Sequence, residues 1–137
     1  MGLRDLIRFW GRSPFQEYDP KEFGRWGEKQ AIKALRRRGY RIIQTNYRSA
    51  LGEIDIIARD GDILVFVEVK ARRSASHGPP VESLTYRKRA HISRAAAAFL
   101  KKHRITDANV RFDVVSVDLT PGGQTEIIRD AFPATLR

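Results

Sequence analysis

Apolar residues recur every three to four positions in two long segments of the chain, and this spacing predicts two helices. The first is expected over residues 20–38, where Asp19 can cap the start and Gly39 follows the end. The second is expected over about residues 81–103, with a break near Thr85 as an alternative. Both segments therefore predict helices that bury one side.

Runs of alternating or continuous apolar residues predict five strands. Asp60-Gly61 separates the second strand from the third and is typical of a tight hairpin, and a Pro-Gly-Gly turn precedes the last strand. The order helix, three-strand meander, helix, strand, strand predicts an α/β sandwich around a mixed sheet. The strands are expected at residues 40–48, 53–59, 62–70, 110–119 and 125–130.

The length of 137 residues and the apolar fraction of 42% favour one folded domain, expected over residues 20–137 after a leader at residues 1–19. The chain contains no cysteine, which excludes disulfides and zinc sites built on thiolates. The three histidines follow no metal-binding pattern. We find no signal peptide and no membrane-spanning run, so we expect the protein in the cytoplasm.

Lys and Arg outnumber Asp and Glu by 26 to 16, and this net charge of +10 predicts a polyanionic partner, either nucleic acid or an anionic membrane. The strongest basic run covers residues 86–104, which hold no acid. A solvated helix face explains most charge runs, but such faces mix both signs, and a single sign favours phosphate contact. The candidate nucleic-acid-binding residues are Arg72, Arg73, Arg87, Lys88, Arg89, Arg94, Lys101 and Lys102, and Arg36–Arg38, Arg41 and Arg48 extend the same patch.

Acidic residues interrupt the second and third strands, which are otherwise apolar. If Asp60-Gly61 forms a two-residue turn, Asp55 faces Phe66 and Glu53 faces Glu68. Strand alternation then places the three acids on one face, which holds Glu53, Asp55, Ile57, Leu64, Phe66, Glu68 and Lys70. The other face is apolar throughout and holds Ile54, Ile56, Ala58, Ile63, Val65, Val67 and Val69. A three-residue turn would instead move Asp55 to the face opposite Glu68.

Asp55 and Glu68 would be diagonal neighbours with Cβ atoms about 7 Å apart, so the two carboxylates can reach one divalent ion. Oxygen ligands without Cys or His favour Mg²⁺ or Mn²⁺. Lys70 points to the same side, where it could orient or deprotonate a water, or balance the charge of a phosphate. The alternative is a solvated edge hairpin in which Glu68 pairs with Lys70. The strand is apolar on both faces up to Glu68, which favours a central strand instead.

An acid in the first helix, followed by D–X(12)–E–X–K across a hairpin, resembles the PD-(D/E)xK nuclease superfamily. The finer resemblance is to the YraN-like family of small bacterial proteins. Its motifs here are Gly27-Glu28-xx-Ala31, Asn46-Tyr47-Arg48, Gly52 to Ala58, and Val67-Glu68-Val69-Lys70-x-Arg72. This resemblance covers roughly residues 20–130. It implies a restriction-endonuclease-like three-layer sandwich with a mixed central sheet flanked by helices, similar to archaeal Holliday-junction resolvases.

The resemblance also implies a role for each matching residue. Glu28, Asp55, Glu68 and Lys70 would be the catalytic residues, and Asp55, Glu68 and the Val69 carbonyl would bind the metal ion, with Glu53 supporting the site from beside it. Without the resemblance, Glu28 lies beside the buried stripe of its helix, but it can equally be an ordinary helix glutamate paired with Lys29 or Arg25.

These observations lead to a first hypothesis, a Mg²⁺- or Mn²⁺-dependent endonuclease that acts on DNA, at a branched or otherwise structured site. The resembling resolvases cut with two active sites, which favours a homodimer. A nucleic-acid-binding protein of the same fold without turnover is the second hypothesis. A membrane-surface protein that uses its leader and basic face is the third, and docking of the leader on the domain is favoured over membrane contact.

Overall fold

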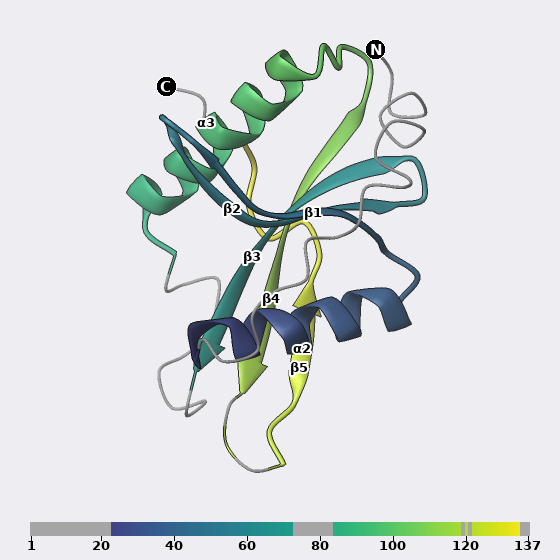
Figure 1. The fold of residues 1–137 in the computed structure, drawn as a ribbon, viewed down its shortest axis with the longest axis vertical. Coiled ribbons are helices and arrows are strands. Elements are labelled where there is room, and N and C mark those ends of the chain that lie inside the picture. Colours follow the sequence, from purple (N-terminus) through teal and green to yellow (C-terminus); the bar gives the residue numbers. More distant parts are fainter. Residues whose placement is uncertain (1–22, 73–83, 119, 121, 135–137) are drawn as a thin grey trace.

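A five-stranded sheet with one helix on each face makes up the computed structural model (Figure 1). The structure describes residues 23–72, 84–118, 120 and 122–134, so the leader expected at residues 1–19 and the candidate Arg73 lie outside the described residues. The elements are α2 (Phe23–Arg37), β1 (Arg41–Ser49), β2 (Gly52–Asp60), β3 (Ile63–Arg72), α3 (Tyr86–Lys102), β4 (Asn109–Asp118) and β5 (Thr125–Ile128).

A glycine turn follows the end of α2, and a capping residue marks the start of α3. α2 ends just before Gly39, whose positive φ of 87° lets the chain reverse into β1. α3 begins at Tyr86 because the Thr85 hydroxyl accepts a hydrogen bond from the Lys88 amide at 3.1 Å, which caps the helix. The break expected near Thr85 is therefore the start of the helix.

The strands lie in the order β1-β2-β3-β4-β5. β1–β2, β2–β3 and β4–β5 are antiparallel, whereas β3–β4 is parallel and its connection contains α3, as a parallel pair requires. This mixed sheet between two helices is the restriction-endonuclease-like α/β sandwich expected from the sequence. Within the described residues, no helix is long and apolar enough to cross a membrane.

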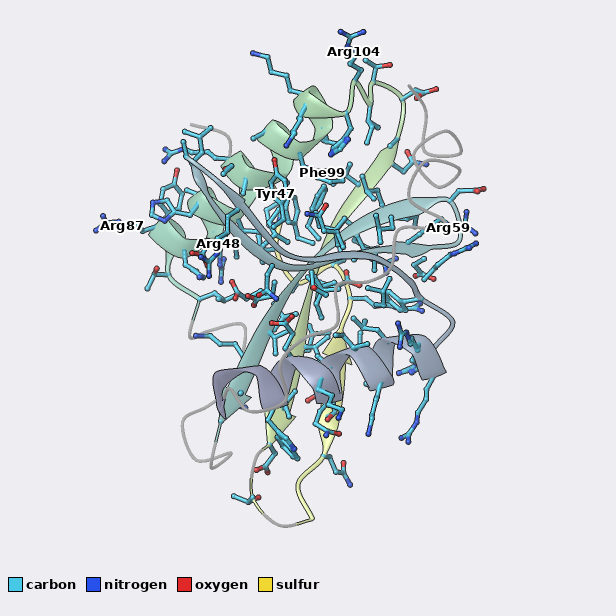
Figure 2. The ribbon with its side chains drawn as sticks, in the orientation of Figure 1. Tyr47, Arg48, Arg59, Arg87, Phe99 and Arg104 are labelled. Carbon is cyan, nitrogen blue, oxygen red and sulfur yellow. The ribbon has the colours of Figure 1, made fainter. Side chains whose placement is uncertain are left out.

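Each face of the sheet carries its own hydrophobic core. On the α3 face, Phe99 lies edge-on to Tyr47 with ring centroids 5.2 Å apart, and 5.9 Å from Phe66 (Figure 2). On the α2 face, the fully buried Ala31 and Leu35 pack over the strands. Burying each large apolar side chain contributes roughly 1.5–3 kcal/mol, so both helices are fixed to the sheet by their apolar sides.

The β2–β3 hairpin turns at Gly61-Asp62 instead of Asp60-Gly61. Asp60 pairs with Ile63, and Arg59 faces Leu64 instead of the expected Asp62. Gly61 has a φ of 59° at the first central position of the turn, where a type II′ hairpin places glycine. The register therefore differs from the predicted one by two residues. A shift of two leaves every side chain on its face, so most of the predicted faces are correct.

Ile54 was predicted on the wrong face. It packs in the α3-side core with Tyr47, its partner on β1, whereas Ile56 packs in the α2-side core as expected. Asn46 lies between the two paired positions and has a φ of 52°, a left-handed conformation that asparagine tolerates. The change of face between Ile56 and Ile54 therefore coincides with the left-handed residue that lies between their β1 partners.

Candidate active site

The acids of the predicted site lie where β2 and β3 separate. The paired residues of these two strands end at Ile56 and Val67, and Asp55 and Glu68 follow directly beyond that pair. There β2 remains paired with β1, and β3 remains paired with β4. The sheet therefore opens between two of its inner strands, and polar side chains must satisfy the backbone groups that the ladder leaves behind.

Asp55 and Glu68 meet in this opening. Asp55 Oδ2 accepts a hydrogen bond from the Val69 amide at 2.8 Å, and its carboxylate lies within hydrogen-bonding reach of Glu68, which is only 8% exposed. Burial, and then the bond and charge of Asp55, raise the pKa of Glu68 to about 9, while Lys88 acts in the opposite direction. Because the register is shifted by two residues, Asp55 and Glu68 each follow the last β2–β3 pair, so they are not the diagonal neighbours that the sequence predicted.

Lys88 forms an ion pair with Glu68, with its ammonium nitrogen 3.5 Å from Oε2. It reaches the acid from the first turn of α3, and its side chain remains 46% exposed. The charge run of α3 predicted Lys88 as a phosphate contact, and the structure places it beside the carboxylate pair. A half-exposed lysine stabilises a buried acid less than a buried partner would, because water competes for its charge.

Glu28 belongs to the same region because α2 begins against the end of β3. A Cβ atom on Gly27 would lie 2.8 Å from Cβ of Ala71, so only glycine permits this approach. Glu28 is 7% exposed, and its Oε1 accepts a hydrogen bond from Asn46 Nδ2 at 2.9 Å. Asn46 lies between Thr45 and Tyr47, whose partners on β2 flank Asp55, so Glu28 is held near the strand acids.

Of the other candidate residues, Lys70 and Val69 lie next to Glu68 along β3, whereas Glu53 lies away from the two acids. Lys70 is half-buried two residues beyond Glu68, in register with Ser116 of β4. Val69 fixes Asp55 through its amide. Glu53 lies away from the pair, since its side chain is 64% exposed and 3.9 Å from Arg48.

The donor set fits a divalent cation held by two carboxylates. Among the described residues, no three acidic, histidine or cysteine side chains form a ready-made metal cluster. Mg²⁺ is commonly bound through one or two carboxylates and completes its shell with water and phosphate oxygens. Asp55 and Glu68 supply two hard oxygen ligands, and a cation between them would relieve the unfavourable contact of two carboxylates.

The predicted basic residues form two surfaces instead of one. Arg87, Lys88, Arg94, Lys101 and Lys102 lie on α3 (the α3 surface), between the Arg87 and Arg104 labels of Figure 2. Arg36 and Arg37, with Arg38 just after them, lie on α2, which covers the opposite face of the sheet. They do not extend the α3 surface as predicted. Arg89 is half-buried, and its guanidinium lies 5.7 Å from the centroid of the Phe132 ring.

Comparison with known proteins shows the family of the chain. The sequence model of Uncharacterised protein family UPF0102 matches residues 27–117. The chain belongs to this family. The UPF0102 protein of Dehalococcoides mccartyi is 47% identical over 83% of this chain and 95% of its own length. The UPF0102 protein of Syntrophus aciditrophicus is 49% identical over 80% of this chain and 87% of its own length. The resemblance to the YraN-like family is thereby confirmed.

Two residues of the candidate active site were not assigned to it from the sequence. Asn46 appeared only as part of a motif, and nothing in the strand pattern indicates that its side chain binds Glu28. Lys88 appeared only as part of a charge run, although it contacts Glu68. The one available signal was the lysine's place in the first turn of a helix that must pack over the acidic strand.

Proposed function

We propose that this UPF0102 protein is a metal-dependent endonuclease that hydrolyses phosphodiester bonds in DNA at branched or otherwise structured sites. The placement of the Asp55 carboxylate beside the buried Glu68 carries the proposal, since both acids follow the last β2–β3 pair and Asp55 Oδ2 is held by the Val69 amide at 2.8 Å. Two carboxylates held together away from water are unfavourable unless a proton or a cation accompanies them. Such a pair on an otherwise apolar strand is typical of a functional site.

Each side chain has a chemical task in this proposal. Asp55 and Glu68 would hold a divalent cation, which supplies positive charge to the phosphate and lowers the pKa of a bound water. Lys70, farther along the strand of Glu68, would orient the attacking water or balance charge on the phosphate oxygens. Glu28, held by Asn46 at 2.9 Å, would keep a second hydrogen-bond acceptor beside that water.

Nucleic acid is the proposed substrate because of the charge beside the acids. Arg87 and Lys88 lie in the first turn of α3, and Lys101 and Lys102 lie in its last turn. Cations spread along one helix match the repeated phosphates of a backbone and position it without reading its sequence.

A non-catalytic nucleic-acid-binding protein is the second candidate function. The Lys88 ammonium lies 3.5 Å from Glu68 and already balances part of its charge. A site whose acid is permanently neutralised by a lysine has less need of a metal ion, and this observation favours binding without turnover.

Cleavage assays separate the two candidates. Labelled four-way junction, duplex and single-stranded DNA are incubated with the protein in Mg²⁺, Mn²⁺ or EDTA. The test variants are Asp55→Asn and Lys70→Ala, and Glu53→Gln is the matched control because this exposed acid lies away from the pair. We expect metal-dependent nicking that Asp55→Asn and Lys70→Ala abolish and Glu53→Gln retains. Binding of all three DNAs without cleavage in either metal would refute the nuclease and favour the binding protein.

A further inference from the structure

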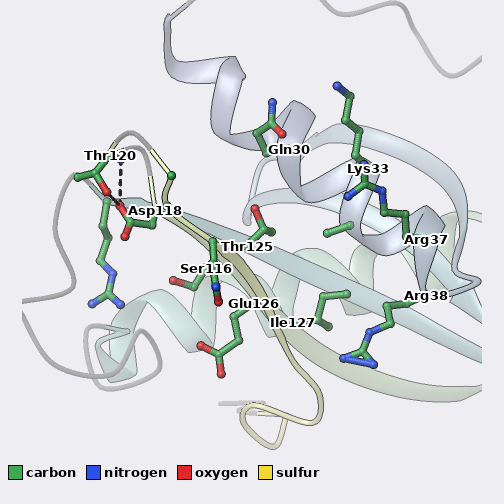
Figure 3. A pocket seen from close by; sticks show the side chains of 15 residues that line it. Gln30, Lys33, Arg37, Arg38, Ser116, Asp118, Thr120, Thr125, Glu126 and Ile127 are labelled. Carbon is green, nitrogen blue, oxygen red and sulfur yellow. Dashed lines mark hydrogen bonds between the residues drawn. The ribbon is translucent and has the colours of Figure 1, made fainter.

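An open groove of about 1060 Å³ runs between α2 and the β4–β5 hairpin, outside the carboxylate site (Figure 3). Lys33, Arg37 and Arg38 line it from the helix side. Gln124 and Thr125 line it from the hairpin, and β5 is the last strand of the sheet. The groove therefore lies along one edge of the sheet, beside α2 and not beside the α3 surface.

Positive charge is concentrated on the helix side of the groove. Lys33 and Arg37 are exposed and lie one turn apart on α2, so their charges repel unless an anion approaches. From residue 29 to residue 52 the chain holds seven Lys or Arg residues and no acid. Of the two acids that line the groove, Asp118 accepts bonds from the Thr120 hydroxyl at 2.6 Å and the Thr120 amide at 2.9 Å.

One end of the groove lies close along the strands to the candidate active site. Arg72 lines one end of the groove and lies two residues beyond Lys70 on β3. Ser116, which also lines the groove, is the register partner of Lys70 on β4. An anionic chain that follows the groove from Arg38 toward Arg72 therefore ends two residues along β3 from Lys70. Spaced cations, hydroxyls and amides suit repeated phosphates better than a single small anion.

We propose that this groove binds a second segment of the nucleic acid backbone, separate from the segment that contacts the α3 surface. The proposal rests on the proposed function for the class of its ligand. α2 and α3 cover opposite faces of the sheet, so one straight segment does not lie along both helices. The two segments meet at the carboxylate site, and the nucleic acid bends or branches there.

Cross-linking locates the groove contact without requiring cleavage. The chain has no cysteine, so single cysteines can carry a photo-reactive maleimide at chosen positions. Gln30→Cys and Thr125→Cys place the probe on the two walls of the groove, and Ala97→Cys places it on the exposed side of α3. The exposed Asp62→Cys, in the β2–β3 turn and outside both the groove lining and α3, is the matched control. Labelled junction and duplex DNA are irradiated with each protein in EDTA. We expect cross-links at positions 30, 97 and 125, and none at 62.

Charge removal then tests the contacts themselves. Lys33→Gln combined with Arg37→Gln should abolish the cross-links at positions 30 and 125 and leave that at 97. The slope of log affinity against log salt should become less steep by roughly 1 for each lost cation. The matched pair Lys101→Gln and Lys102→Gln, on the α3 surface, should lower affinity and leave the groove cross-links unchanged.

The outcomes separate this inference from the proposed function. Cross-linking at 97 without 30 or 125 overturns the groove and leaves the nuclease intact. Groove cross-linking together with a complete failure to cleave DNA supports the groove and refutes the nuclease. If polyglutamate competes for positions 30 and 125 as well as DNA does at equal charge, the groove selects no nucleic acid and the inference is overturned.

Discussion

Replacing Glu68 by glutamine should make the protein more stable at alkaline pH. In the folded protein, burial and the contact with Asp55 raise the pKa of Glu68 to about 9, from an ordinary value of 4.5. The unfolded chain therefore loses this proton near pH 4.5, while the folded chain keeps it. Between these two values the folded state binds more protons, so the free energy of unfolding falls as pH rises.

The magnitude follows from the same pKa shift. One pKa unit corresponds to about 1.4 kcal/mol, so at pH 7.5, three units above 4.5, Glu68 costs up to about 4 kcal/mol of stability in the absence of a cation. Glutamine has nearly the same shape and can still bond to Asp55, but it has no proton to lose. Glu68→Gln should match the wild type near pH 4.5 and exceed it by up to about 4 kcal/mol at pH 7.5.

Equilibrium urea denaturation in EDTA at several pH values between 5 and 8 measures this difference. Subtracting the wild-type values from those of the variant cancels the titration of all other groups. Glu53→Gln is the control, because it makes the same substitution at an exposed side chain away from Glu68. Parallel pH curves for wild type and Glu68→Gln would refute the reasoning, since Glu68 would then titrate as an ordinary carboxylate.

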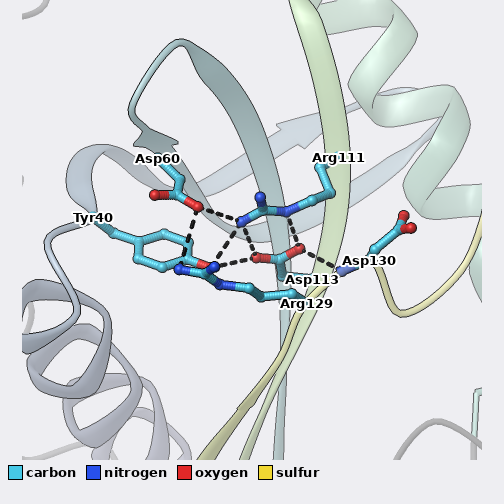
Figure 4. A network of polar contacts seen from close by, with 6 residues as sticks. All are labelled: Tyr40, Asp60, Arg111, Asp113, Arg129 and Asp130. Atoms are coloured by element: carbon cyan, nitrogen blue, oxygen red, sulfur yellow. Dashed lines mark hydrogen bonds and ion pairs between the residues drawn. The ribbon is translucent and has the colours of Figure 1, made fainter.

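Three further predictions concern other contacts. Lys88→Met removes the cation that lies 3.5 Å from Glu68, so Mn²⁺ should bind roughly tenfold more tightly in calorimetry, and unchanged binding would contradict this. Phe99→Ala leaves a cavity in the α3-side core and should lower the free energy of unfolding in urea by roughly 3–5 kcal/mol, whereas a loss below 1 kcal/mol would contradict this. Arg111→Met should also cost roughly 3–5 kcal/mol, because Arg111 Nε lies 2.8 Å from Asp113, which is fully buried (Figure 4). Adding Asp113→Leu should recover part of that loss, since it removes the buried charge that Arg111→Met leaves unpaired.

The elements and faces of the fold could be predicted because each depends on local pattern. Alternation alone placed Phe66 and Val67 on opposite faces of the sheet, and this is confirmed, since Phe66 packs on the α3 side and Val67 on the α2 side. The exact hairpin register depends on whether Gly61 or Asp60 occupies the first central position of the turn, a difference that Asp-Gly alone does not settle. A two-residue error preserves the faces, so Asp55 and Glu68 could be grouped although their predicted register was wrong.

Contacts between residues distant in sequence could not be predicted. Tyr40 and Asp113 are 73 positions apart, yet the tyrosine hydroxyl donates to the carboxylate at 2.7 Å. Arg111 joins them and reaches Asp60 at 2.8 Å, which ties the β2–β3 turn to β4 (Figure 4). No periodicity encodes these partners, because they depend on how β3 and β4 align after the α3 crossover. The Asn46–Glu28 bond was missed for the same reason.

Asp113 on β4 and Glu68 on the neighbouring β3 are both buried acids, but only Glu68 has surroundings that favour a bound cation. Asp113 accepts bonds from Tyr40, from two nitrogens of Arg111 and from the Asp130 amide, all between 2.7 and 3.0 Å. Its charge is fully matched by permanent partners, so it has no need of another cation. Glu68 is almost as buried, but it meets a second carboxylate and a half-exposed lysine. The fold surrounds Asp113 with a full set of hydrogen-bond donors, whereas Glu68 has too few positive partners for its charge. This difference is the strongest physical reason to expect an exchangeable cation at Asp55 and Glu68.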